Sequence, residues 1–162
     1  MPVVSDASPL ILLTKIRRLD LLKKLYSEVL IPKEVKEEVT RQEATPTISG
    51  IREGWIKVTE AELSPEVKEV GGKLGLHEGE LYALSLALHA NIKEILVDDK
   101  LARVVARILG LKAIGCLGVN MKAYEAGIIT RSEAVNTVQK LVKAGLWISP
   151  EVLGEVLTSL EI

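Results

Sequence analysis

The sequence predicts an α/β domain in which helices flank a mostly parallel sheet of about five strands. Short apolar runs rich in β-branched residues alternate with helical segments, and the connections between them are only a few residues long. Two of these runs end in aspartate and lead directly into a helix. Since the carboxyl ends of parallel strands meet at one edge of a sheet, where ligands bind, the same pattern predicts the place of a site.

The first half of the chain supplies three of the strands. The first precedes Asp6, and Ser8 and Pro9 then favour the start of a helix. Pro46 and Gly50 predict a loop with a short helix at 45–54. The other elements expected here are strands at 3–5, 28–31 and 55–59, the last an edge strand, and helices at 9–16, 19–26 and 32–39.

The second half supplies two strands and most of the helices. A helix that opens at Ser64 should end at Gly71-Gly72 or by Gly75. The helix at 76–88 is apolar around most of its circumference, which predicts burial on several sides. Strands are expected at 94–99 and 111–114, and helices at 101–109, 117–126, 131–143 and 150–160. We expect the helices from about residue 117 to pack on the domain or to form an oligomer interface, with buried or interface positions at Leu141, Leu146, Trp147 and Leu153.

The composition is typical of one globular domain, expected to span residues 1–162, with 48% hydrophobic and 27% charged residues. No run approaches the ~18 apolar residues of a spanning helix and no signal peptide is evident, so a cytoplasmic protein without membrane contact is expected. The net charge of −1 argues against a protein that coats nucleic acids. Two tryptophans, three tyrosines and no phenylalanine predict no platform for stacking single-stranded bases.

The numbers of cysteines and histidines limit the kinds of metal site that the chain can form. Cys116 is the one cysteine and is expected to be a buried thiol, and His77 and His89 are the two histidines. A zinc site with nitrogen and sulfur ligands is therefore not expected. A metal ion in this protein would have to be held by oxygen.

Four carboxylates stand where a core element meets the carboxyl edge of the predicted sheet: Asp6, Glu38, Glu80 and Asp98. Ordinary roles remain open, since Asp6 could cap a turn and Glu38 could be a surface charge balanced by Arg41. Two unit charges about 4 Å apart repel by ~4 kcal/mol at an effective dielectric of ~20, so these acids converge only around a cation or with raised pKa values. Mg²⁺ or Mn²⁺ is then the natural occupant.

Nearby residues have weaker claims to a role in the site. Glu80 is expected at the start of a buried helix, where the helix dipole favours an anion, while Glu78 should be more exposed and His77 could cap the helix. A basic cluster is better explained as a solvated helix surface than as a phosphate-contacting patch; its members are Lys15, Arg17, Arg18, Lys23 and Lys24.

Four ordered motifs resemble those of PIN-domain proteins, specifically the compact prokaryotic branch related to VapC-type toxin ribonucleases. They are Val-Ser-Asp-Ala-Ser-Pro-Leu at 4–10, Ile-Pro-Lys-Glu-Val-Lys-Glu-Glu-Val at 31–39, Leu-His-Glu-Gly-Glu-Leu-Tyr-Ala-Leu at 76–84 and Leu-Val-Asp-Asp-Lys-Leu-Ala-Arg at 96–103. Each motif is weak alone, but the ordered set covers nearly the whole chain.

The resemblance implies a site of acids. Asp6 matches the family's first aspartate, Glu38 the acid after Pro-x-x-Val-x-x, and Glu80 the glutamate that opens the buried helix. The acid after the fourth strand is Asp98 or Asp99, and we favour Asp98. The metal ligands implied are Asp6, Asp98, Asp99 and Glu80, with Ser8 as a supporting polar group; weaker phosphate-binding candidates are Lys15, Lys100 and Arg103.

The activity implied by the resemblance is hydrolysis of single-stranded RNA that depends on Mg²⁺ or Mn²⁺. A toxin role would imply an antitoxin partner, and such PIN domains commonly form homodimers or higher homo-oligomers. Two alternatives stay open. One is a catalytically silent, metal-binding regulator that acts through a protein partner. The other is a phosphotransfer or phosphatase domain with Asp6 as nucleophile, which is weaker because Asp6-Ala7-Ser8 lacks the second aspartate usual in such loops.

Overall fold

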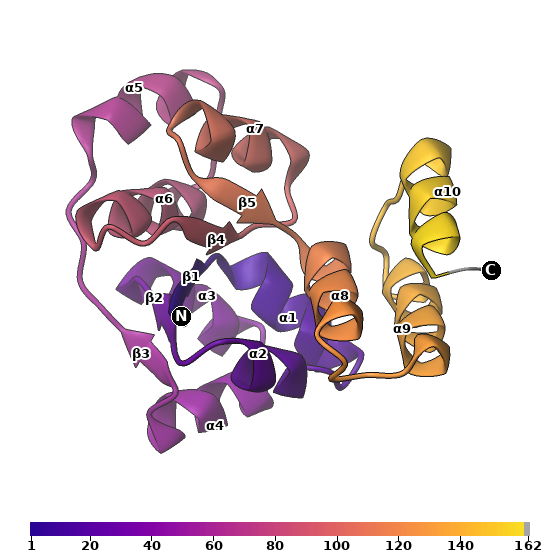
Figure 1. The fold of residues 1–162 in the computed structure, drawn as a ribbon. Helices are drawn as coiled ribbons and strands as arrows, with labels where there is room; N and C mark the ends of the chain where they lie inside the picture. The colour runs from indigo at the N-terminus through magenta and orange to yellow at the C-terminus, as the bar shows by residue number, and fades with distance from the viewer. Residues whose placement is uncertain (161–162) are drawn as a thin grey trace.

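The computed structural model describes residues 1–160, in which five parallel strands form one sheet with helices packed around it (Figure 1). The strand order is β3-β2-β1-β4-β5, and every neighbouring pair is parallel. The strands are β1 (Val3–Ser5), β2 (Val29–Ile31), β3 (Ile56–Val58), β4 (Glu94–Leu96) and β5 (Lys112–Ile114). The predicted fold class is confirmed, and β3 lies at an edge of the sheet as expected.

Helices follow the strands at nearly the predicted positions. They are α1 (Ala7–Lys15), α2 (Asp20–Leu25), α3 (Lys33–Arg41), α4 (Thr45–Glu53), α5 (Pro65–Lys73), α6 (Glu78–His89), α7 (Lys100–Ile108), α8 (Cys116–Glu125), α9 (Arg131–Lys143) and α10 (Pro150–Ser159). None of the helices in the described part of the chain is long and apolar enough to cross a membrane.

The short helix expected within 45–54 is confirmed, but the loop expected around it is wrong, because α4 occupies nearly the whole segment as a nine-residue helix. Pro46 lies in its first turn, where the missing N–H costs nothing, and the helix ends at Gly54 with a positive φ of 89°. Gly50 is buried against β3, so close that a Cβ atom there would lie 2.6 Å from Cδ1 of Ile56. The proline and glycine that suggested a loop therefore serve the start and the packing of a helix.

Helix α6 is the central helix of the core. It packs against β1 and β4 and against α3 and α5, which explains why its sequence is apolar around most of its circumference. Val3, Val4, Ile95 and Leu96 of the two central strands are fully buried. The core thus fixes the ends of β1 and β4 relative to the first turn of α6.

The C-terminal helices lie together at one side of the sheet in Figure 1, with α8 packed on α2 and α9 packed on α8. Leu141 is fully buried, as predicted. Trp147, in the connection between α9 and α10, is 75% exposed, so of the two expected positions, buried or interface, the buried one is excluded. Gly145 ends the turn after α9 with a φ of 106°, and the chain then carries the indole outward.

The order in which successive strands are added to the sheet reverses at β1. Strands β2 and β3 extend from one side of it and β4 and β5 from the other, which makes the crevice between the ends of β1 and β4 the topological switch point. The N–H of Asp6 donates to the carbonyl of Leu96 at 2.9 Å, which ties the two strand ends together. The acids that follow β1 and β4 are neighbours at this crevice.

Candidate active site

Asp6 lies at the centre of the site, directly after β1 and at the N-cap of α1. Its residue is only 4% exposed, and its side chain makes no capping hydrogen bond. Burial raises the pKa of this carboxyl from its ordinary value of 3.8 to about 7; the N–H of Ala7 acts against the rise, and the charges of Glu80, Asp98 and Asp99 add to it. The turn-capping explanation therefore does not account for this carboxylate.

Glu80 is the second buried acid, in the first turn of α6, and is 5% exposed. Its Oε1 accepts a hydrogen bond from the N–H of His77 at 2.9 Å, so the side chain reaches back to close the start of the helix. Burial raises its pKa, the His77 N–H lowers it, and the charge of Asp99 raises it further. Glu78 is exposed, as the sequence predicted.

Glu38 faces the same space from α3. Val35 and Val39 on either side of it are fully buried, which places Glu38 at the border of the core. One of its oxygens forms an ion pair with Arg41, the surface partner considered from the sequence. The ion pair does not remove Glu38 from the candidate site, since Glu38 and Arg41 line one cavity with Asp6.

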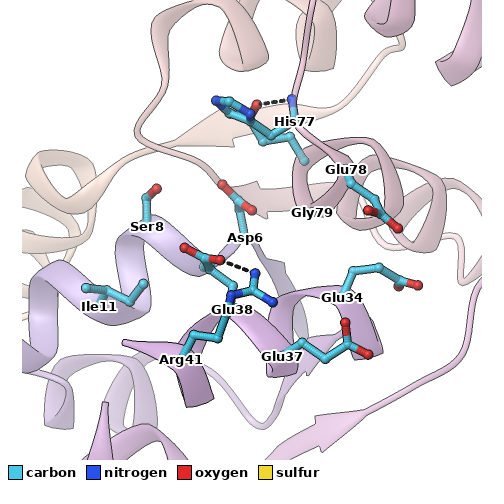
Figure 2. Close-up of a pocket in the computed structure, with 12 residues that line it drawn as sticks. Asp6, Ser8, Ile11, Glu34, Glu37, Glu38, Arg41, His77, Glu78 and Gly79 are labelled. Atoms are coloured by element: carbon cyan, nitrogen blue, oxygen red, sulfur yellow. Dashed lines mark hydrogen bonds and ion pairs between the residues drawn. The ribbon is translucent and has the colours of Figure 1, made fainter. Parts of the chain in front are cut away.

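That cavity, of about 370 Å³, is strongly acidic and is called the acid pocket below. Figure 2 shows the carboxylates of Asp6 and Glu38 directed toward its middle, with His77 and Glu78 of the α6 end on the far side. It is lined by Asp6, Ala7, Ser8, Ile11, Glu34, Glu37, Glu38, Arg41, His77, Glu78, Gly79 and Glu80. Six carboxylates thus face one guanidinium, an excess of negative charge that attracts cations.

The two aspartates after β4 have different partners. Asp98 accepts two hydrogen bonds from Cys116, one from the N–H at 2.7 Å and one from the thiol at 3.1 Å. Burial foremost, with the charge of Asp98, keeps the pKa of the Cys116 thiol well above its ordinary value, so the thiol remains a donor. Asp99 caps α7 by accepting from the N–H of Ala102 at 2.8 Å.

The donor set fits a hard divalent cation in its chemistry. Asp6 is a buried carboxylate with a raised pKa, and three other acids contribute to that rise, which a cation of charge two would relieve. As they are placed, no three His, Cys, Asp or Glu side chains of residues 1–160 are grouped closely enough to hold a metal ion. Several of the acids are instead engaged with protein partners, so binding a metal ion requires some of them to turn.

The remaining candidates lie around the acid pocket. Ser8 lines its wall, and Arg103 donates to the carbonyl of Asp98 at 2.6 Å. Lys100 begins α7 beside Asp99, and Lys15 lies further along α1 at a neighbouring cavity. The other basic residues at 17–24 are largely occupied by surface ion pairs, of Arg18 and Lys24 with Asp20 and of Lys23 with Glu53.

Two glycines belong to the site although the sequence did not mark them. A Cβ atom at Gly115 would lie 2.5 Å from Oδ1 of Asp98, whereas one at Gly79 would lie 3.5 Å from Oδ1 of Asp6. Gly115 therefore makes room for the bond between Asp98 and the Cys116 N–H. The only signal in the sequence was a glycine between a strand and a helix, which many turns share.

Comparison with known proteins adds the family. A family model described as a PIN domain matches residues 2–161. The chain belongs to the PIN-domain family. No curated protein and no solved structure is similar enough to count as a match. PIN domains are typically nucleases and generally use divalent metal ions such as Mg²⁺, which agrees with an acid pocket at the switch point of this PIN domain.

Proposed function

We propose that this PIN-domain protein is a metal-dependent ribonuclease that hydrolyses phosphodiester bonds of single-stranded RNA. The observation that carries the proposal is the buried carboxylate of Asp6 at the switch point, uncapped and facing the acid pocket. A buried acid whose pKa is raised despite the adjacent Ala7 N–H is unfavourable for folding alone. Family membership supplies the chemistry that gives it a use.

Asp6 and Glu80, with Asp98 or Asp99, would hold Mg²⁺ or Mn²⁺. The bound ion would activate a water molecule and neutralise charge on the scissile phosphate. Glu38 approaches from the opposite wall, and only one of its oxygens is used by Arg41. We assign Glu38 to orient the attacking water and accept its proton, and Arg41 to hold that carboxylate in place.

Asp98 and Asp99 differ in the hydrogen bonds that each would lose on binding a metal ion. Asp98 would have to share oxygens that already accept from Cys116, whereas Asp99 uses a single oxygen to cap α7. We keep Asp98 as the favoured ligand because it borders the cavity next to the acid pocket, together with Ser8 and Glu38. Lys15, Lys100 and Arg103 are assigned to the RNA backbone, where they would add salt-sensitive affinity.

A cleavage assay on a mixed pool of single-stranded RNA tests the proposal, with the parent compared with Asp6→Asn. Mg²⁺ or Mn²⁺ should support cleavage by the parent, and a chelator should abolish it. Asp6→Asn should be folded, as judged by circular dichroism, and inactive. Equal cleavage by both proteins would reject the site, and cleavage that survives the chelator would reject the metal dependence.

A second candidate is a metal-binding regulator without catalytic activity. It is favoured by one observation, namely that several acids of the site already accept hydrogen bonds from the protein, which leaves fewer of their oxygens for catalysis. Calorimetry with Mn²⁺ separates the candidates when it is combined with the cleavage assay. Binding of Mn²⁺ without turnover of any RNA would favour the regulator.

The biological setting we assign is that of a toxin in the cytoplasm, where its RNA substrates are, as a homodimer or higher homo-oligomer. An antitoxin would cover the acid pocket with a basic segment, because six carboxylates line it. Purification from the native source should then yield a small basic partner and an inactive complex. Recovery of the free, active chain would contradict the toxin assignment.

A further inference from the structure

We infer that Trp147 forms a stacking subsite for a nucleobase of the single-stranded RNA, immediately beside the acid pocket. The inference rests on the proposed function and names a substrate contact for it. It replaces the sequence-based expectation that the chain has no platform for stacked bases. The observations behind it are an exposed indole, a cavity under it and the acids that this cavity shares with the site.

The cavity beside Trp147 has a volume of about 340 Å³ and lies between segments that are far apart in the sequence. On one side it is bounded by α1 and α3, and on the other by the connection between α9 and α10. Ser8, Ile11 and Glu38 line both this cavity and the acid pocket, and Asp98 lines this one as well. A nucleotide held here would lie next to the proposed site of hydrolysis.

The exposure of Trp147 has no structural benefit for the isolated chain. An indole is among the largest apolar groups and stabilises a fold mainly when it is buried, yet Trp147 is 75% exposed while its neighbour Leu146 is half-buried. Leu146 thus anchors the connection, and Trp147 stands at the rim of the cavity. The flat face of an indole accepts any base, because every base has a π-face.

The polar residues of the cavity suit a nucleotide better than an apolar partner. Lys15 lines it, and this ammonium group has no ion pair with any residue of the described chain. It is placed to contact a phosphate that follows the scissile one. Gln42 and Ser8 add groups that can donate or accept hydrogen bonds at a base edge. The exposed indole, the lysine in the cavity wall and the continuity with the acids all point to RNA.

Tryptophan fluorescence tests the subsite directly. The chain has two tryptophans, so Trp55→Phe leaves Trp147 as the only reporter. In an Asp6→Asn, Trp55→Phe protein with Mg²⁺, a mixed-sequence RNA octamer should quench the emission, and an abasic octamer of the same length should quench it far less. In the Asp6→Asn background, Trp147→Ala should weaken octamer binding about tenfold, measured by anisotropy of a labelled strand, and Trp147→Phe should retain most of the affinity.

The control is Ile108→Ala, which removes another exposed apolar side chain, 62% exposed and on α7; binding should not change. Equal quenching by the abasic strand, or unchanged affinity of Trp147→Ala, would overturn the subsite. A blue shift of the Trp147 emission that depends on protein concentration would assign the indole to contact between copies of the chain and would also overturn it.

Cleavage by the parent separates this inference from the proposed function. If the parent cleaves RNA and Trp147→Ala raises KM about tenfold with little change in kcat, both stand. If Trp147→Ala cleaves with an unchanged KM, the subsite is wrong and the nuclease remains. If RNA quenches Trp147 but the parent cleaves nothing, the subsite stands and the nuclease proposal fails.

Discussion

The ends of β1 and β4 share one sequence pattern, an apolar strand followed by aspartate and a helix, but the two ends differ in their partners. Asp6 is buried and makes no capping hydrogen bond. After β4, Asp98 is held by Cys116 and Asp99 caps α7. The same sequence pattern at the end of a strand therefore does not determine the role of its aspartate. The carboxylate whose pKa is raised by burial, with no capping hydrogen bond of its own, is the one whose presence needs a ligand to explain it.

The largest expected effect is the loss of activity when the aspartate after β1 is replaced. Asp6→Asn should lower kcat for RNA cleavage by about a thousandfold or more, because it removes the central charged ligand and the effect of a lost ligand exceeds the 10–100-fold typical of supporting residues. The measurement is single-turnover cleavage at saturating Mg²⁺. A loss smaller than tenfold would place the reaction elsewhere.

Replacing either of the two aspartates after β4 should cause the next largest loss of activity. Asp98→Asn should lower activity about a hundredfold, and Asp99→Asn about tenfold, as a lost supporting residue does. Asparagine caps helices as well as aspartate, so Asp99→Asn should keep its free energy of unfolding within about 0.5 kcal/mol of the parent. Any loss of activity in Asp99→Asn is then a property of the site. The reverse order of the two variants would make Asp99 the main ligand.

The raised pKa of Asp6 predicts how the stability of the metal-free protein changes with pH. The folded chain keeps the Asp6 proton up to about pH 7, while the unfolded chain loses it near 3.8. The stability from this group is complete below about pH 4 and is lost as the pH rises to about 7. Above pH 7, Asp6→Asn should be more stable than the metal-free parent by about 2 kcal/mol, less than the full conversion of the shift because the amide must also be desolvated.

Denaturant unfolding with a chelator present, at pH 4 and pH 8, checks this prediction. The difference between Asp6→Asn and the parent should grow from the lower to the higher pH. Glu80, whose pKa is also raised, acts in the same direction in both proteins. A parent that gains stability relative to Asp6→Asn as the pH rises would show that the Asp6 carboxylate has a favourable partner.

The smallest expected effect comes from a matched pair of glycines, one beside each strand end. Gly115→Ala would push a Cβ atom against Oδ1 of Asp98, and activity should fall about tenfold as the aspartate is displaced. Gly79→Ala would place its Cβ at ordinary contact distance from Asp6, and alanine favours the helix, so activity should stay close to that of the parent. Equal activity of the two variants would show that the position of Asp98 does not matter.

Much of the fold was predictable because its signals are local. The apolar runs before Asp6 and Asp98 predicted the central strands, and the continuous apolar character of α6 predicted its burial. The length of helix α4 was underestimated because Pro46 and Gly50 are turn formers in isolation, and only the approach of β3 shows that Gly50 must be small.

The acids that line the acid pocket could be predicted in part from the sequence, but the contacts of the candidate site could not. The sequence supplied Asp6, Glu38 and Glu80, and their positions beside one cavity follow from the sheet topology. It left Asp98 and Asp99 equivalent, because their partners are set by Cys116, 18 positions from Asp98, and by the start of α7. The exposure of Trp147 was hidden for the same reason, since it depends on how the connection after α9 meets α1 and α3.

The central claim is that the acid pocket binds a divalent cation through Asp6, although the other acids have protein partners. Calorimetric titration with Mn²⁺ near pH 7.5, on the parent and on Asp6→Asn, tests it most directly. The parent should bind Mn²⁺ and release protons, and Asp6→Asn should bind at least about tenfold more weakly. Identical titration curves for the two proteins, or no binding by the parent, would contradict the account.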